Sequence, residues 1–272
     1  MSQVFLAFLS GAMGVMIGGT ASFVVTGFVG ILVILIDAVG GNSLLLNEQV
    51  LNFFFMPCIC FNGATAAMAF AANWRHHPMN GADGNRSLYF TGDPWVILVG
   101  GLFGMVGYGF YTLFDYLNVP IDIGALVVII VNSLIRFLFG THKYIHHPEQ
   151  PLFRKATRHF WVFQCLFAII ISLSVAYFVD LTGVASIGFS ISALSLIFAF
   201  SHPEFPASHH ISIIAGYAMM ATGSYVISAF FGILSQIIFI VFTNYFNTDL
   251  DTHVDGPAAA IAPLSFIIFT LF

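Results

Sequence analysis

Acidic side chains and one histidine alternate near the end of the chain, in the segment NTDLDTHVDG. Asp249, Asp251, His253 and Asp255 occupy every second position there. In an extended segment such side chains share one face. Carboxylates together with an imidazole suit a divalent cation, so Asp249, Asp251 and His253 are candidate metal ligands. The competing interpretation is a solvated loop between apolar segments, and the polar composition favours it.

Two short polar motifs form a second candidate site. Asn62-Gly63 and Asp255-Gly256 each precede a run of small residues, in FNGATAAMA and DGPAAAIA. An Asn or Asp within an apolar segment needs a partner, which makes these four residues candidates for binding a solute. The alternative is that each polar side chain caps a half-helix that begins just after it, and such a helix N-terminus is itself a set of donors.

Hydroxyl side chains flank glycines inside two long apolar stretches. The four residues are Thr20, Ser22, Thr222 and Ser224. Their hydroxyls could replace hydrogen bonds that a broken helix loses, or they could meet a polar solute. The alternative is that Ser and Thr mediate helix packing.

The chain has 10 histidines, and most fall in polar loops. They are His76, His77, His142, His146, His147, His159, His202, His209 and His210, with His253 apart from them. Such clusters could bind a metal ion or sense pH. Three of them stand before proline, which favours the plainer interpretation that proline ends a helix and the histidine reaches the interface.

The elements that carry these residues belong to a membrane protein. Of the 272 residues, 59% are apolar and 7% are charged, whereas a soluble domain carries about 25% charged residues. Apolar stretches fall at 3–37, 50–72, 95–117, 119–139, 160–179, 183–200, 211–243 and 256–272. We therefore predict an all-α, polytopic helical protein that forms a single integral membrane domain over residues 1–272.

Two of these stretches, 3–37 and 211–243, are too long for one crossing. Each would extend about 50 Å as a single helix, whereas the hydrocarbon core is about 30 Å thick. Gly18-Gly19 interrupts the first stretch and Gly223 the second. We expect each stretch to form a pair of broken or re-entrant helices, which gives about ten membrane segments.

Basic residues predict the orientation. All 7 Lys and Arg residues lie between positions 75 and 158. Because basic residues concentrate on the cytoplasmic side, loops 73–94, 140–159 and 201–210 should be cytoplasmic and both chain ends outside.

The sequence also repeats itself. GTASFVVTGFVGIL, which begins at Gly19, matches ATGSYVISAFFGIL, which begins at Ala221. The repeat elements are then 3–72 and 211–272, with 95–148 and 160–203 as a second pair of two-helix elements. Counting two crossings in each long stretch makes the first pair inverted, although the second pair does not follow a simple inversion.

GTASFVVTGFVGIL followed by FNGATAAMAFA resembles the urea-transporter family. The second half also resembles a poorly characterised family of multi-pass bacterial membrane proteins. The resemblance implies two homologous inverted halves around a solute path. The Leu-Pro-x-x-Thr-x-Pro-Phe filter motif of urea transporters is absent, which argues against urea as the solute.

A transporter or channel for a small polar solute is therefore the expected function, with its path between the two repeats. The alternatives are a subunit of a larger membrane complex and a metal-handling protein. We expect no enzyme and no cofactor, because nucleotide-binding and nucleophile motifs are absent, and no nucleic-acid partner, because the sequence has no basic tail and no RNA-binding signature. The expected partners are the lipid bilayer and the solute, with homo-oligomers or other membrane subunits possible, in a bacterial cytoplasmic (cell inner) membrane.

Overall fold

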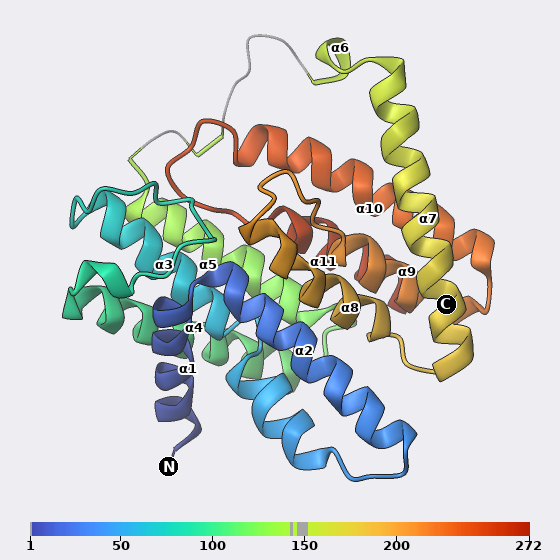
Figure 1. Cartoon of the computed structure of the whole chain (residues 1–272), viewed down its shortest axis with the longest axis horizontal. Helices are drawn as coiled ribbons and strands as arrows, with labels where there is room; N and C mark the ends of the chain where they lie inside the picture. Colours follow the sequence, from blue (N-terminus) through green and yellow to red (C-terminus); the bar gives the residue numbers. More distant parts are fainter. Residues whose placement is uncertain (1, 142–143, 146–151) are drawn as a thin grey trace.

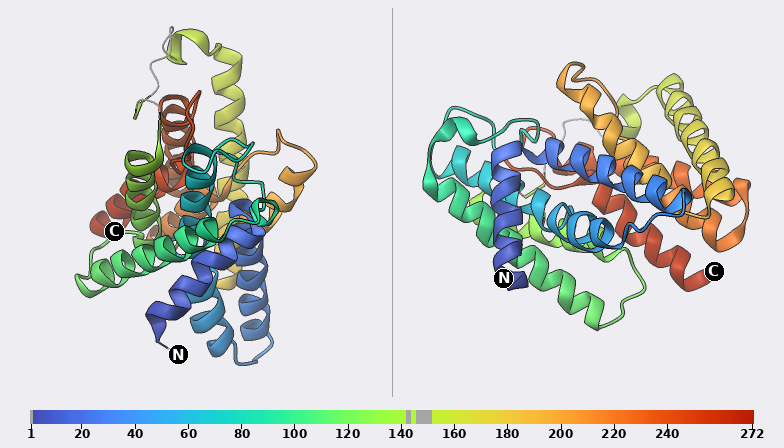
Figure 2. Two further views of the ribbon diagram at one scale, coloured as in Figure 1. Left: turned by 90° about the vertical axis from the view of Figure 1, so that its left-hand side faces the viewer. Right: turned by 60° about the horizontal axis from the view of Figure 1, so that its bottom comes forward.

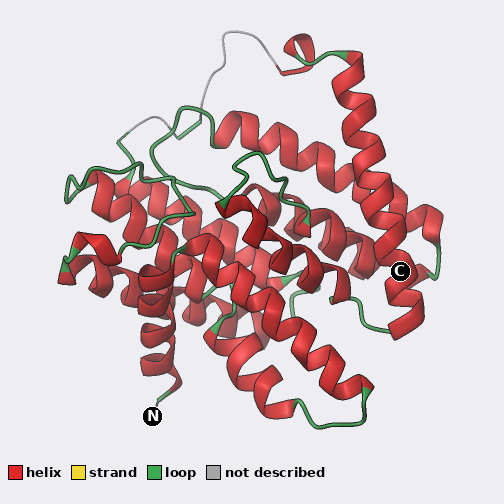
Figure 3. Cartoon of the chain, viewed as in Figure 1, coloured by secondary structure: helices red, strands yellow, loops and turns green. Residues whose placement is uncertain are grey.

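The computed structural model describes residues 2–141, 144–145 and 152–272, with only the backbone of residues 153 and 154. Within these residues the chain forms helices, turns and loops and no strand, as Figures 1 and 3 show. The predicted all-α class is confirmed. The histidines of loop 140–159 at positions 142, 146 and 147 lie outside the described residues.

In the described part of the chain, four helices are long and apolar enough to cross a membrane. They are α2 (Gly19–Ala38), α4 (Pro94–Tyr116), α7 (Arg158–Thr182) and α10 (Tyr225–Phe246). The shorter apolar helices are α1 (Gln3–Ile17), α5 (Ile123–Phe139), α8 (Ile187–Ser195), which continues as η3 (Leu196–Phe200), and α11 (Gly256–Leu271). The remaining helices are η1 (Leu46–Phe54), α3 (Cys60–Asn73), η2 (Tyr89–Thr91), α6 (Leu152–Lys155) and α9 (His209–Thr222).

Both long apolar stretches divide at the glycines that the sequence indicated. Gly18 separates α1 from α2 with φ +94° and ψ 156°, and Gly223 separates α9 from α10 with φ +63°. Only glycine adopts the Gly18 conformation readily, because a Cβ atom would clash with the backbone. The helices on either side of each break then run in different directions.

Two boundaries differ from the prediction. The stretch 50–72 is interrupted, because the π-helical η1 ends at Phe54 and α3 begins at Cys60. Pro57 lies in the turn between them and has no N–H for a continuous helix. His209 and His210, expected in loop 201–210, instead begin α9 and are 5% and 0% exposed.

The helices of the two halves pack in corresponding pairs. In the first half α1 packs against α3 and α4, and α5 lies against the same two helices. In the second half α7 packs against α9 and α10, and α11 lies against these two. Among the described residues, the halves meet chiefly where α2 packs against α8 and its continuation η3, and where α5 packs against α11. Figure 2 shows the same grouping from two further directions.

Loops gather at two sides of the molecule in Figure 1. Residues 74–93, 201–208 and 247–255 lie at the upper side of that view, and residues 40–45 and 183–186 lie at the lower side. Loops 73–94, 140–159 and 201–210 are predicted to share the cytoplasmic side. Residues 74–93 and 201–208 lie at the same side of the molecule in Figure 1, whereas much of loop 140–159 falls outside the described residues.

Candidate functional site

A cavity of about 500 Å³ lies between the two halves. Its walls come from α2, η1, α4, α5, α8, α9 and α11, so it lies beside the contacts of α2 with α8 and of α5 with α11. Two carboxyl groups and one imidazole are among its polar lining, those of Asp122, Asp255 and His209. No Lys or Arg belongs to the lining within the described part of the chain. The cavity is therefore acidic and is shared between the halves.

Asp122 marks one end of the cavity, where it caps α5. Its Oδ1 accepts a hydrogen bond from the N–H of Ala125 at 2.9 Å, and its Oδ2 accepts one from the Tyr217 hydroxyl at 2.8 Å. The backbone N–H of Asp122 donates to Ser265 Oγ of α11 at 2.9 Å. This end of the cavity is thus tied to both α9 and α11.

Asp255 marks the other end in the same way, at the start of α11. Its Oδ2 accepts from the N–H of Ala258 at 2.7 Å, and its Oδ1 lies 3.3 Å from His253 Nε2. Its backbone N–H donates to Asn132 Oδ1 of α5 at 3.1 Å. The capping role that the sequence suggested for Asp255 is confirmed. Each cap is fastened by a polar side chain of the opposite helix, Ser265 for Asp122 and Asn132 for Asp255.

The two caps place α5 and α11 side by side and antiparallel. Asp122 bonds to Ser265, which lies about ten residues beyond Asp255 on α11. At 1.5 Å per residue the two aspartates are therefore about 15 Å apart. The N-termini of α5 and α11 lie at opposite ends of this pair of helices. Each N-terminus carries a partial positive charge and is capped by an aspartate with a full negative charge.

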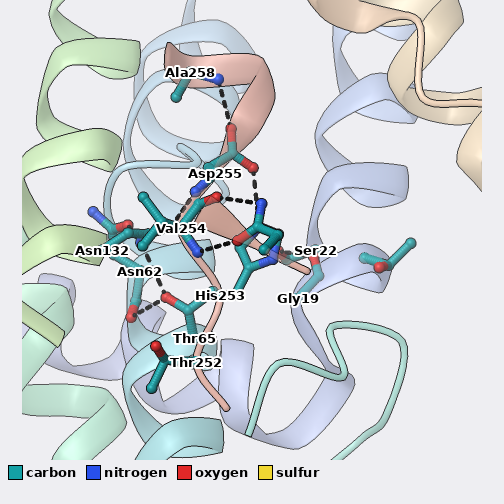
Figure 4. A network of polar contacts seen from close by, with 12 residues as sticks. Gly19, Ser22, Asn62, Thr65, Asn132, Thr252, His253, Val254, Asp255 and Ala258 are labelled. Carbon is teal, nitrogen blue, oxygen red and sulfur yellow. Dashed lines mark hydrogen bonds and ion pairs between the residues drawn. The ribbon is translucent and has the colours of Figure 1, made fainter. Parts of the chain in front are cut away.

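Asn132 connects the two predicted polar motifs (Figure 4). Its Nδ2 donates to Asn62 Oδ1 at 2.9 Å and to Thr65 Oγ1 at 3.3 Å, while its Oδ1 accepts from Asp255. Asn62 itself is fully buried, and its Nδ2 donates to the Cys58 carbonyl at 2.8 Å. Asn62 therefore lies within the first turn of α3 and does not cap it, which corrects the capping interpretation for this residue.

His209 differs from the other polar residues of the cavity because neither of its ring nitrogens has a hydrogen-bond partner among the described residues. The side chain is 5% exposed, and its ring lies 5.1 Å from that of Phe23 and 6.0 Å from that of Phe189. Buried polar atoms are normally paired with protein or ordered water. Within the described residues the hydrogen-bonding capacity of this imidazole is thus unused.

The hydroxyls beside the helix breaks bond locally. Ser22 Oγ donates to the Gly19 carbonyl, Thr222 Oγ1 donates to the Ala218 carbonyl, and Ser224 Oγ caps α10 by accepting from Ile227 N–H. Thr20 Oγ1 donates to Asn85 in the loop before α4. None of these four hydroxyl residues is part of the cavity wall.

The two glycines of the motifs are packing positions. A Cβ atom at Gly63 would lie 2.5 Å from the Cα of Gly11, and one at Gly256 would lie 2.6 Å from Thr243 Oγ1. Each glycine therefore permits close approach between helices.

The candidate metal ligands have separate surroundings. Asp251 Oδ2 accepts from the N–H and hydroxyl of Thr141, whereas His253 contacts Asp255. Asp249 lies in a turn with φ +52°. Within the described residues no three His, Cys, Asp or Glu side chains come close enough to hold a metal ion.

Sequence reasoning missed the central residues of the site. Asn132 lies inside the apolar stretch 119–139, and an amide there was a usable signal, since an intramembrane polar residue needs a partner. Asp122 resembles an ordinary residue at a segment end, and His209 resembles one of many loop histidines. Their importance depends on which helices meet, and the sequence does not state this.

A family model described as "Family of unknown function (DUF7973)" matches residues 1–152 and 155–272. No curated protein and no solved structure matches the chain.

Proposed function

The chain belongs to the family of unknown function DUF7973, and we propose that it is a membrane transporter for a small polar solute, whose path is the cavity between its two halves. The observation that carries this proposal is the cavity of about 500 Å³. Its wall contains Asp122, Asp255 and His209, and the ring nitrogens of His209 have no hydrogen-bond partner among the described residues. Solute sites in transporters commonly lie where half-helix N-termini meet between structural repeats.

The proposal includes an inverted repeat of five helices. We pair α1, α2, α3, α4 and α5 with α7, α8, α9, α10 and α11. The corresponding packing of the two groups supports this pairing, as do the reciprocal caps at Asp122 and Asp255. It differs from the sequence pairing of 3–72 with 211–272, under which α2 would correspond to α10. However, α2 packs against α8, whereas α10 packs against α7 and α9.

Five crossings in each half give ten membrane segments. Because five is an odd number, the second half begins on the side of the membrane opposite to that on which the first half begins. The short helices α5 and α11, of 17 and 16 residues, then enter from opposite sides. With the basic loops in the cytoplasm of a bacterial cell, Asp122 belongs to the outer end of the path and Asp255 to the inner end. A solute crossing the membrane would thus pass one carboxylate and then the other.

Reconstitution into liposomes tests the proposal. Flux of small polar solutes, screened over cations, neutral solutes and anions, should exceed that of protein-free liposomes. Gly124→Trp should abolish this flux, because Gly124 lines the cavity and an added Cβ meets only the Asp122 carboxylate, which leaves the indole to fill the open space.

The matched control is Gly109→Trp on α4. Gly109 is exposed, and nothing lies within 4 Å of an added Cβ there. This variant should transport normally. A wild-type protein that moves no solute of the panel would overturn the proposed function, and so would equal flux in the two tryptophan variants.

A further inference from the structure

The cavity carries the charge pattern of a cation site. Asp122 and Asp255 both line it, and no Lys or Arg joins them among the described lining residues. The N-termini of α5 and α11 each contribute about half a positive charge. Each is already met by its capping carboxylate, through Ala125 N–H and Ala258 N–H. At the Asp122 end the remaining field is negative and repels anions, and the same holds at the Asp255 end while His253, which contacts Asp255, is neutral.

His209 provides a further group that a ligand would satisfy. The ring is 5% exposed, lines the cavity, and has neither nitrogen bonded within the described part of the chain. A neutral imidazole accepts one hydrogen bond and donates one. It can therefore accept an N–H from an ammonium group. The ring of Phe23, which also lines the cavity, lies 5.1 Å from that of His209.

The two ends of the cavity are alike in chemistry but far apart. Along α9, eight residues separate His209 near one end from Tyr217 at the other, about 12 Å of helix. Along α11, Asp255 and the Ser265 that fastens Asp122 are about 15 Å apart. Apolar side chains line the space between, among them Ile213, Ala258 and Ile261. Along α9 and α11 the wall is thus polar at both ends and apolar between them. Other elements contribute further polar lining residues, which are Thr26, Asn47, Asn52, Tyr111, Ser186 and Ser190.

This pattern disfavours a metal ion as the occupant. Within the described residues no three His, Cys, Asp or Glu side chains converge, and hard cations need several oxygen ligands at one point. A monovalent organic amine would satisfy one carboxylate and leave the other without a countercharge. A linear molecule with a positive charge at each end meets both.

We propose that the cavity binds a linear aliphatic diamine, with one ammonium at Asp255 and His209, the other at Asp122 beside Tyr217, and the methylene chain along the apolar wall. This assignment rests on the proposed function, since it names the solute class of the same path. Charge-assisted N–H···O contacts are about 2.8 Å long, which leaves about 10 Å between the two nitrogens. An extended chain of about seven carbons spans that distance.

Ligand binding to the purified full-length protein tests the assignment without transport. Isothermal titration in detergent would use α,ω-diamines of increasing length, together with heptylamine and heptane-1,7-diol. Affinity should peak near seven carbons, at least tenfold above heptylamine, and the uncharged diol should not bind. Affinity that is independent of length, or equal for diamine and monoamine, would overturn the proposal.

Variants of the two aspartates locate the charges. Asp122→Asn and Asp255→Asn keep a capping side chain but remove the charge. Either change should reduce the preference for the diamine over the monoamine to threefold or less. Asp180→Asn is the matched control, since Asp180 also accepts from a tyrosine hydroxyl, that of Tyr225, but lies outside the cavity.

A variant of His209 and a measurement of folding complete the test. His209→Leu should weaken the diamine at least fivefold without changing its preferred length. Each variant is first compared with wild type by its melting temperature without ligand. If one aspartate variant does not fold, the other variant and the length series decide the result. An unchanged preference in a folded aspartate variant contradicts the assignment.

Binding and flux separate this inference from the proposed function. Tight diamine binding without flux supports the assigned ligand and counts against transport. Flux of other solutes through a protein that binds no diamine refutes the ligand and leaves transport standing.

Discussion

At the scale of residues, Asn132 holds together elements that are distant in sequence. It is fully buried between α3, α5 and the start of α11, and uses both ends of its amide. Replacing it leaves Asn62 Oδ1 and the Asp255 N–H without partners, each costing about 1–3 kcal/mol. We expect Asn132→Ala to destabilise the protein by about 3 kcal/mol in detergent unfolding.

The control for this change is Asn42→Ala. Asn42 is exposed, and its side chain accepts only from the nearby Leu44 N–H. Its loss should change stability by no more than about 0.5 kcal/mol. Similar effects of the two substitutions would contradict a structural role for Asn132.

Asp93, in the loop before α4, makes stability depend on pH. Burial raises the pKa of this carboxyl, but hydrogen bonds from Arg75 Nε at 2.6 Å, the Trp95 N–H and His77 outweigh that effect and hold the pKa below its ordinary value. The ionised carboxylate therefore stabilises the fold at neutral pH. This stabilisation is lost as pH falls through the lowered pKa.

Asp93→Asn keeps the helix cap but removes the charge. At pH 7 we expect it to cost about 1 kcal/mol, because the Arg75 side chain is half exposed and water weakens the pair. The difference in melting temperature from wild type should shrink as the pH falls below about 3.9, the ordinary pKa of an aspartate, and should vanish once the pH is below the lowered pKa that Asp93 has in the fold. A difference that stays constant from pH 7 to pH 3 would show that the charge is unimportant.

Some of these residues were visible in the sequence and others were not. Asp255 and Asn62 were identified because polar residues stand out in apolar runs. Their connection through Asn132 was not identified, because a hydrogen bond across 123 positions depends on how the helices pack. His209 was assigned to a loop because its polar neighbours on the N-terminal side obscured the start of α9.

At the scale of elements, glycines permit the contact among α1, α3 and α4. A Cβ atom at Gly63 would lie 2.7 Å from the Gly100 carbonyl oxygen and 2.5 Å from the Cα of Gly11. Backbone atoms cannot move aside without separating the helices. Gly63→Ala should therefore destabilise the protein by about 1–3 kcal/mol, measured by unfolding in detergent.

Gly109→Ala on α4 is the matched substitution for this test. It has open space around the new methyl group, and alanine favours the helix by up to about 1 kcal/mol. This variant should be as stable as wild type or slightly more so. Equal destabilisation by both alanines would mean that close packing at Gly63 is not the cause.

The two helix breaks tolerate different residues. Gly223 has the left-handed conformation that asparagine also adopts, whereas Gly18, at φ +94° and ψ 156°, occupies a region that is essentially restricted to glycine. Gly223→Asn should fold with nearly wild-type stability. Gly18→Asn should cost about 1–3 kcal/mol and lower the yield of monodisperse protein in size-exclusion chromatography. The reverse order of stability would contradict this account of the breaks.

The sequence predicts those helix boundaries that the conformational preference of glycine determines. The breaks at Gly18 and Gly223 were predicted because length and glycine placement agree. The division of 50–72 into η1 and α3 was not, because its apolar composition is continuous and only Pro57 signals the turn. Composition does not predict which helices pack against each other, because the apolar faces of different helices consist of similar residues.

At the scale of the molecule, the positions of equivalent loops distinguish an inverted repeat from a parallel one. Asn42 follows α2, the second helix of the first half, and Ser201 follows α8 and η3, the corresponding helices of the second half. In an inverted repeat, equivalent loops lie on opposite sides of the membrane, and in a parallel repeat they lie on the same side. Figure 1 has the two loops at opposite sides of the molecule.

Cysteine labelling in whole cells tests this arrangement. Asn42→Cys and Ser201→Cys would each be introduced into a Cys165→Ala background, which leaves the buried Cys58 and Cys60 unreactive. An impermeant maleimide should label Cys at position 42 in intact cells, and Cys at position 201 only after the membrane is opened. Because basic loops favour the cytoplasm, 201 is expected inside. Labelling of both positions from one side would refute the inverted repeat, and with it the assignment of Asp122 and Asp255 to opposite ends of the path.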